Sequence, residues 1–240
     1  SACLVGSEMC IRDRCNGMDI QSCFKKANEI DDYIDAHFDY AFDEKYGYKT
    51  TFPTNTGTGM KAGYTLHLPS LSDARRLNDI SAELGRFGLK FRTVYGDGQN
   101  GYGNLYQIST QKTLGQDERE VIKDLDDIVL QIVNQEKEQR EHFYKKDKIQ
   151  MDDEIYKSYG VLKYARKLSL KDSMVLISEL MTGVSLGVLQ FAHNGRYNIN
   201  ELIMDIQPAV LRQNSGKAMS VAETDVLRAE YIRKYLPEII

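Results

Sequence analysis

The chain has 240 residues, of which 42% are hydrophobic and 28% are charged, and its formal net charge is −4. These values describe an ordinary globular protein with enough length for one large domain or two small ones. The acidic balance argues against nucleic-acid binding, which needs a broad basic surface. No apolar run approaches the ~20 residues that cross a bilayer, so the sequence predicts no membrane segment.

The first residues are set apart from the rest of the prediction. The stretch "VGSEMCIRDR" resembles the translation of a sequencing-library adapter, so residues 1–14 are interpreted as an artefact and excluded from the fold. The cysteines all fall within the first 23 residues, and their spacing fits neither a metal site nor a disulfide set. We therefore expect a reducing, cytoplasmic environment and no metal-ligating set.

Apolar periodicity from Ile20 to Ala41 predicts a helix that begins after Asp19, its N-cap, and ends near residues 45–47. A short strand is expected at residues 47–52, followed by a loop of small residues at 54–59. Small residues let backbone N–H groups approach an anion, and Lys61 adds a positive charge directly after the loop. Taken alone, this loop is better explained as a tight turn between strands than as an anion site.

The middle of the chain alternates between strand and helix patterns. Strands are predicted at residues 63–69 and 89–96, with a helix over 72–84 between them. The glycine-rich stretch 96–103 then leads into a strand at 104–110, which we expect to pair with the preceding strand as a hairpin.

The remainder of the chain has only helical periodicity. A long helix is predicted from residues 115–117 to Lys146, and later breaks are expected near Gly160, Lys167, residues 194–196 and Gly216. The charge run over residues 136–148 alternates in sign, which is typical of an exposed or interdomain helix.

The pattern as a whole predicts an α+β fold, with an antiparallel sheet flanked by helices and an all-helical C-terminal domain. The expected boundaries are residues 15–146 for the first domain and 147–240 for the second. Two glycine-rich loops on neighbouring strands, each with a cation nearby, suit phosphate groups held from two sides, and a loop that closes over a nucleotide also excludes water. The cations are Lys61 and Arg92.

Several motifs carry a family resemblance. "PTNTGTGMKAG", "FRTVYGDG" and "TLGQDEREVIKDL" resemble the catalytic domain of the phosphagen kinases, the ATP:guanido phosphotransferases. "IYKSYGVLKYAR", "INELIMDIQPAVLRQNSGKA" and "TDVLRAEYIRKYL" resemble the helical domain of one branch, the bacterial protein-arginine kinases. The resemblance runs from about Gly17 to Leu236, and its second half points to proteins, not small guanidines, as substrates.

The resemblance implies a kinase that uses ATP and Mg²⁺ to phosphorylate arginine side chains of proteins. It also implies a homodimer, a zinc-finger activator and Clp-type protease machinery as partners. The nucleotide-binding residues implied are Lys61, Ala62, Gly63, Tyr64, Thr65, Arg92, Thr93, Val94, Tyr95, Gly96 and Asp97. A phosphoarginine-binding motif is implied at Thr224, Asp225, Arg228 and Ala229.

The chain departs from the family pattern at functional positions. Phe52 stands where the family has a reactive cysteine, and Asn100 stands where small-guanidine kinases have a carboxylate. Lys61 replaces an arginine and loses its bidentate fork, and Thr224 replaces one arginine of the phosphoarginine motif.

These departures leave two main functions open. The first is a protein-arginine kinase, of which this chain is an N-terminally truncated fragment, inactive alone because the family's catalytic carboxylate lies upstream of Gly17. The second is a pseudokinase or binding module that regulates an active partner. A kinase for free small guanidines is a third, which the helical domain argues against.

Overall fold

The computed structural model describes residues 14–15, 17–50, 55–96, 101–111, 113–115, 117–192 and 199–240. The chain divides into two compact units. The first, here called the sheet unit, consists of Ser1–Leu66, Ala74–Val94 and Tyr106–Gln135. The second, the helical unit, consists of His67–Asp73, Tyr95–Leu105 and Glu136–Ile240.

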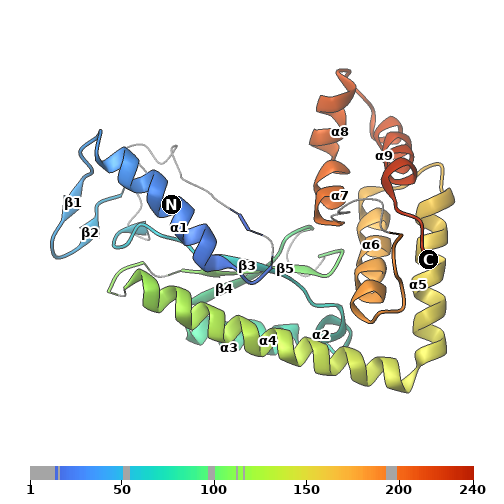
Figure 1. Cartoon of the computed structure of the whole chain (residues 1–240), viewed down its shortest axis with the longest axis horizontal. Coiled ribbons are helices and arrows are strands. Elements are labelled where there is room, and N and C mark those ends of the chain that lie inside the picture. Colours follow the sequence, from blue (N-terminus) through green and yellow to red (C-terminus); the bar gives the residue numbers. More distant parts are fainter. Residues whose placement is uncertain are drawn as a thin grey trace. The chain divides into compact units, whose positions relative to one another are not determined.

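A three-stranded sheet organises the first unit (Figure 1), in the order β3 (Gly63–His67), β5 (Leu105–Thr110), β4 (Leu89–Thr93). β4 and β5 are antiparallel, with Arg92 opposite Gln107, so the predicted hairpin is confirmed. β4 ends three residues earlier than the expected 89–96.

Helices α1 (Ile20–Asp35), α3 (Leu77–Arg86) and the first turns of α4 (Glu118–Lys146) complete the sheet unit. α4 follows its prediction closely. Its apolar stripe is buried, through Val121, Ile122, Leu125, Val129 and Ile132. Ile80 and Leu84 of α3 are buried in the same way.

The first helix is shorter than predicted. Asp19 caps it as expected, its carboxylate accepting from Ser22 N at 3.2 Å, but the helix ends at Asp35 and not near residues 45–47. A small hairpin follows, formed by β1 (Phe42–Asp43) and β2 (Gly47–Tyr48). Phe38, which continued the apolar period, is 63% exposed, so no packing extends the helix. β2 is also the described part of the strand expected at 47–52.

The helix predicted over residues 72–84 is two helices. α2 (Pro69–Asp73) begins three residues early, and Arg75, with φ 57°, separates it from α3. The early start has a tertiary cause, because the Glu136 carboxylate accepts from the first amides of α2, Ser70 N at 3.1 Å and Leu71 N at 2.9 Å.

The helical unit contains α5 (Lys148–Tyr164), α6 (Leu170–Ser185), α7 (Ile199–Asp205), α8 (Pro208–Ser215) and α9 (Val221–Tyr235), together with α2. Breaks are confirmed after Tyr164, close to Lys167, and at Gly216, which ends α8 in the left-handed conformation with φ 63°. The break expected at Gly160 is wrong, because α5 runs through it. Residues 194–196 lie outside the described residues.

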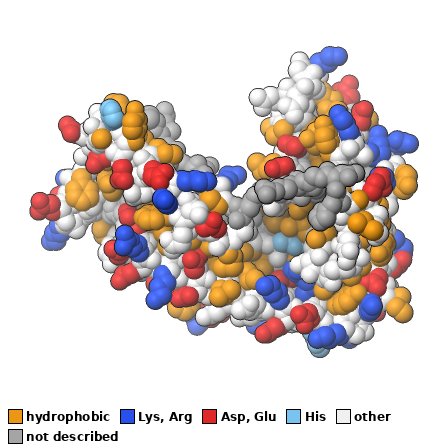
Figure 2. Space-filling model, viewed as in Figure 1, with side chains coloured by type: hydrophobic (Ala, Val, Ile, Leu, Met, Phe, Trp, Pro, Cys, Tyr) orange, Lys and Arg blue, Asp and Glu red, His pale blue; other side chains and the backbone are white. Residues whose placement is uncertain are grey.

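Charged side chains of both signs are interspersed along α4 on the face shown in Figure 2, as the alternating run predicted. Two members of that run are nevertheless buried. Glu136 and Arg140 are 2% and 8% exposed and form an ion pair at 2.9 Å. Arg140 also donates to Ser185 Oγ at 2.6 Å, which ties α4 to α6 within the helical unit.

The predicted α+β class is confirmed: small antiparallel sheets are accompanied by helices, and a helical part follows. The boundary at residue 146 stays a prediction, since the two compact units alternate along the chain. In the part of the chain that the structure describes, no helix is long and apolar enough to cross a membrane.

Candidate functional site

One face of the sheet is exposed and polar. Side chains alternate along β4, which places Lys90 and Arg92 on the same face, and both are exposed. Their partners on β5 are Ser109 and Gln107, respectively. This surface, here called the polar sheet face, therefore contains cations beside a hydroxyl and an amide.

β3 extends the polar sheet face on the other side of β5. Gly63 and Thr65 are exposed, and the same alternation carried back along the chain reaches Lys61, which is also exposed. A Cβ atom added to Gly63 would lie 2.6 Å from Ile108 O, so β3 approaches β5 more closely than any other residue type would permit. The glycine thus keeps Lys61 close to the central strand.

Arg92 is held in place without being neutralised. Its Nε donates to Gln107 Oε1 at 2.8 Å, and Nη2 donates to the same oxygen. Gln107 is uncharged, and among the residues that the structure describes Arg92 forms no ion pair. A guanidinium has five N–H donors, so this geometry leaves donors for an exposed ligand.

The polar sheet face suits phosphate oxygens. Arginine binds them through paired charge-assisted hydrogen bonds, and lysine adds a point charge. Mg²⁺ prefers carboxylate oxygens, phosphates and water, whereas the face offers Lys61, Lys90 and Arg92 with hydroxyl and amide groups. The described residues contain no group of His, Cys, Asp and Glu that could hold a metal. The face therefore fits a polyphosphate and not the metal.

Other residues of the predicted nucleotide set point elsewhere. Tyr64 is buried on the opposite face of β3, where its hydroxyl donates to Asp126 of α4, and burial together with this bond raises the pKa of Tyr64. Ala62 N donates to Thr110 Oγ1 at 3.1 Å across the sheet. Tyr64 and Ala62 therefore keep the strands and α4 together, and any contact of Tyr64 with a nucleotide is through its main chain.

The second predicted segment leaves the sheet. Thr93 ends β4 and Val94 is 38% exposed, while Tyr95 stacks on Tyr102 within the helical unit, with 6.3 Å between ring centroids. Gly96 has φ 90°. Phe52, Asp97 and Asn100 lie outside the described residues.

The predicted phosphoarginine motif lies inside the helical unit. Arg228 is 1% exposed, and it donates to Ile206 O at 3.0 Å, to Leu168 O at 2.9 Å and to Asp225 Oδ1 at 2.6 Å. Thr224 and Ala229 are also buried, at 2% and 0%. The guanidinium thus already has three oxygen partners, and two of them are main-chain carbonyls.

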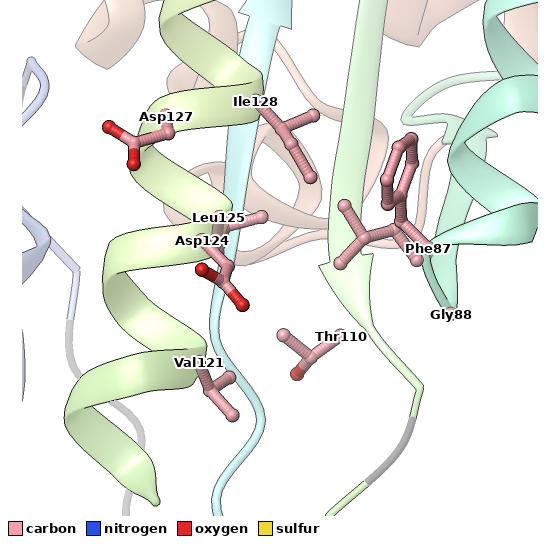
Figure 3. A pocket seen from close by; sticks show the side chains of 9 residues that line it. Phe87, Gly88, Thr110, Val121, Asp124, Leu125, Asp127 and Ile128 are labelled. Carbon is pink, nitrogen blue, oxygen red and sulfur yellow. The ribbon is translucent and has the colours of Figure 1, made fainter. Parts of the chain in front are cut away.

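A hollow of about 300 Å³ (Figure 3) is lined by residues that do not belong to the polar sheet face. It is formed by the turn after α3, the end of β5 and one side of α4, with apolar walls such as Leu125 and Ile128. Asp124 projects toward Thr110, whereas Asp127 points away from the hollow (Figure 3). Its lining has no cation, so it does not suit a phosphate.

Sequence reasoning missed Lys90, Gln107 and Ser109 as members of the candidate site. The signal was present, because two-residue alternation in a predicted hairpin places Lys90 beside Arg92 and sets Gln107 opposite it. What the sequence lacked was the register, which fixes the residue that each cation faces.

Comparisons with known proteins divide the chain in two. Residues 8–139 match the family described as ATP:guanido phosphotransferase, C-terminal catalytic domain. Residues 148–239 match the family described as protein-arginine kinase McsB C-terminal domain.

Curated relatives match almost the whole chain. The protein-arginine kinase of Bacillus subtilis is 38% identical over 235 residues, which are 97% of this chain and 64% of the relative. That of Clostridium kluyveri is 38% identical and covers 97% of this chain and 68% of the relative. The chain thus spans 64% of the length of the Bacillus relative.

Among solved structures, the duplicated taurocyamine kinase from Schistosoma mansoni is 30% identical, with a TM-score of 0.42 over 48% of this chain and 16% of that one. Lombricine kinase is 25% identical, with a TM-score of 0.42 over 50% of this chain and 33% of that one.

Proposed function

The chain belongs to the ATP:guanido phosphotransferase family, and we propose that it is part of a protein-arginine kinase. In this reaction a guanidinium nitrogen of a protein arginine forms a bond to the γ-phosphorus of ATP. The bond from that phosphorus to the β–γ bridging oxygen breaks, ADP leaves, and the guanidinium nitrogen loses a proton. The observation that carries the proposal is Arg92 on the polar sheet face, which is exposed and forms no ion pair with the residues that the structure describes.

The residues of the face have separate roles in this proposal. Arg92, oriented by Gln107, binds phosphate oxygens and stabilises the charge that develops as the γ-phosphoryl group is transferred. Lys61 and Lys90 add positive charge on either side of β5. Gly63 keeps β3 close to β5, so that these charges converge on one ligand.

Nucleotide binding is the first test, and it needs only the 240-residue chain. Arg92→Ala should weaken binding of Mg-ATP about 10- to 100-fold in calorimetric titration, because charge-assisted hydrogen bonds to phosphate are lost. Arg86→Ala is the matched control, since Arg86 is an exposed arginine in the last turn of α3. Equal affinities of the two variants would remove the polar sheet face from the proposal.

Phosphoryl transfer is the second test. An active kinase transfers label from γ-labelled ATP to an arginine-rich protein in an acid-labile form. This test needs a chain that includes the family's upstream catalytic carboxylate, because the 240 residues alone are expected to be inactive under both hypotheses. In such a chain, binding of Mg-ATP without transfer favours the alternative, a binding module that regulates an active partner, which the replacement of the family cysteine by Phe52 supports. Phe52→Cys distinguishes the two further, since no gain in turnover would show that Phe52 does not limit the reaction.

Cofactors and partners belong to the same proposal. Mg²⁺ arrives with the phosphates of ATP, and the substrates are proteins with exposed arginines. A second copy of the chain, a zinc-finger activator, Clp-type protease machinery and a cytoplasmic location are expected from the family resemblance. Residues 147–240 are proposed as the dimerisation domain, and the solution mass of the chain tests this assignment.

A further inference from the structure

Two segments that leave the polar sheet face belong to the helical unit. His67–Asp73 begins with the last residue of β3, and Tyr95–Leu105 leads from β4 to the first residue of β5. The proposed phosphate-binding residues come earlier in the chain than these segments, Lys61 ahead of β3 and Arg92 in β4. The end of β3 and the connection from β4 to β5 therefore pack within the helical unit.

The two segments meet at one hydroxyl. Ser178 of α6 is 1% exposed, and its Oγ lies 2.8 Å from His67 Nε2 and 3.1 Å from Asn104 Nδ2. The backbone joins the same segments, because Leu68 N donates to Asn104 O at 2.9 Å. The end of β3 and the approach to β5 are thus fixed to each other and to α6.

Ser178, His67 and Asn104 are here called the node, and the hydrogen bonds among them are mutually consistent. Burial, with a smaller effect of the nearby Arg140 charge, lowers the pKa of His67 to about 3, so its ring is neutral near pH 7. The amide of Asn104 donates to Ser178 Oγ, which leaves the hydroxyl proton for His67 Nε2. One buried serine therefore bonds to two half-buried side chains from separate segments.

Packing also holds the end of the glycine-rich connection, directly before β5. A Cβ atom added to Gly103, which has φ 78°, would lie 3.0 Å from Met174 Cε, so the backbone lies directly on α6. Asn104 has φ 51°, a left-handed conformation that asparagine tolerates. Leu105 then enters the hydrophobic core of the helical unit.

We propose that Ser178 is a positioning residue of the nucleotide site: through His67 it fixes the end of β3, which Lys61 precedes, and through Asn104 it fixes the start of β5, which carries Gln107, the partner of Arg92. The ligand in this inference, Mg-ATP, comes from the proposed function. The contacts of Ser178 with His67 and Asn104 do not depend on that function. It also defines a route by which a change in α6 alters nucleotide affinity.

The test compares two serines of α6. Ser178→Ala removes the node, whereas Ser173→Ala is the matched control, because Ser173 is 0% exposed and donates only within its own chain segment, to Ser169 O at 2.8 Å. Amide hydrogen exchange of residues 67–71 and 101–106 should accelerate in Ser178→Ala and not in Ser173→Ala. The affinity for Mg-ATP should fall about fivefold or more in Ser178→Ala alone, the size typical of coupling between sites.

Asn104→Gly provides a second variant, because glycine keeps the left-handed backbone and removes only the amide. It should show faster exchange at 101–106 and the same loss of Mg-ATP affinity. The proposal is overturned if both variants bind Mg-ATP as tightly as the unsubstituted chain, or if Ser173→Ala weakens binding equally.

Failure of the proposed function gives a different result. If the unsubstituted chain binds no Mg-ATP, the nucleotide assignment fails. Hydrogen exchange is then the only measurement that tests whether Ser178 holds His67 and Asn104 in place. Faster exchange confined to Ser178→Ala and Asn104→Gly then still supports Ser178 as the residue that sets the strand ends, whereas unchanged exchange overturns it.

Discussion

The polar sheet face and the interior of the helical unit each centre on an arginine, but the two arginines have opposite surroundings. Arg92 is exposed and bonded to one neutral side chain, Gln107. Arg228 is 1% exposed and bonded to two carbonyl oxygens and a carboxylate. An exposed guanidinium is available to a ligand, whereas a buried one that bonds to distant loops stabilises the fold.

The family resemblance assigned Arg92 to the phosphates of a nucleotide and Arg228 to a phosphoarginine, and the comparison separates these two assignments. Arg228 joins α9 to the loop before α6 and to the turn after α7, through Leu168 O and Ile206 O. Because Arg228 is 1% exposed, we propose that these bonds give it a structural role, whereas the exposed Arg92 is proposed to bind the ligand. The phosphoarginine motif stays a prediction.

Arg228→Ala should have the largest effect on stability. It leaves Asp225 as a buried carboxylate without its partner and removes donors from two carbonyls, which should lower the free energy of unfolding by about 3–5 kcal/mol. Urea unfolding followed by circular dichroism measures this change. Arg212→Ala, an exposed arginine in the last turn of α8, is the control and should cost less than about 0.5 kcal/mol.

The opposite result would break the comparison. If Arg228→Ala is as stable as Arg212→Ala but loses binding of a phosphoarginine peptide, the buried arginine is a ligand site after all. The two arginines would then differ in exposure but not in role.

The pH dependence of the helical unit should be intermediate in size. The pKa of His67 is lowered from 6.5 to about 3 in the folded chain, so below pH 6.5 the unfolded chain binds more protons. His67 therefore stabilises the fold above its unfolded pKa, and this stability is lost as pH falls toward 3. Between pH 6.5 and pH 5 the loss should be about 2 kcal/mol.

His67→Gln isolates this contribution, because glutamine keeps a polar side chain and does not titrate. Unfolding in urea at pH 7.5, 6.5 and 5 should show a flatter profile for His67→Gln than for the unsubstituted chain. His142→Gln, which replaces an exposed histidine of α4, should leave the profile unchanged. Parallel profiles for all three chains would show that His67 is not desolvated on folding.

Local patterns predicted the elements whose partners are close in sequence. α4 was predictable because its apolar stripe repeats at helical spacing, and the β4–β5 hairpin because alternation and glycines frame it. Positions governed by distant residues were not predictable. The start of α2 depends on Glu136, and the burial of Arg228 depends on carbonyls at residues 168 and 206.

The same distinction applies to the candidate site. The resemblance pointed to Arg92 and Lys61, and their exposure agrees with a role in binding. It also pointed to Tyr64, whose side chain faces α4, because a motif names positions in the chain and not the face on which each side chain lies. Alternation along β3 would have separated Tyr64 from Gly63 and Thr65.

The smallest expected stability change sharpens the comparison most. Arg92→Ala should alter the free energy of unfolding by less than about 0.5 kcal/mol in urea, because an exposed side chain bonded to a neutral partner contributes little. The same variant should lose most of its affinity for Mg-ATP, so binding and stability separate at Arg92. A loss of stability comparable to that of Arg228→Ala would mean that the Arg92–Gln107 contact holds the sheet together. The availability of Arg92 to phosphate, on which the proposed function depends, would then have no physical basis.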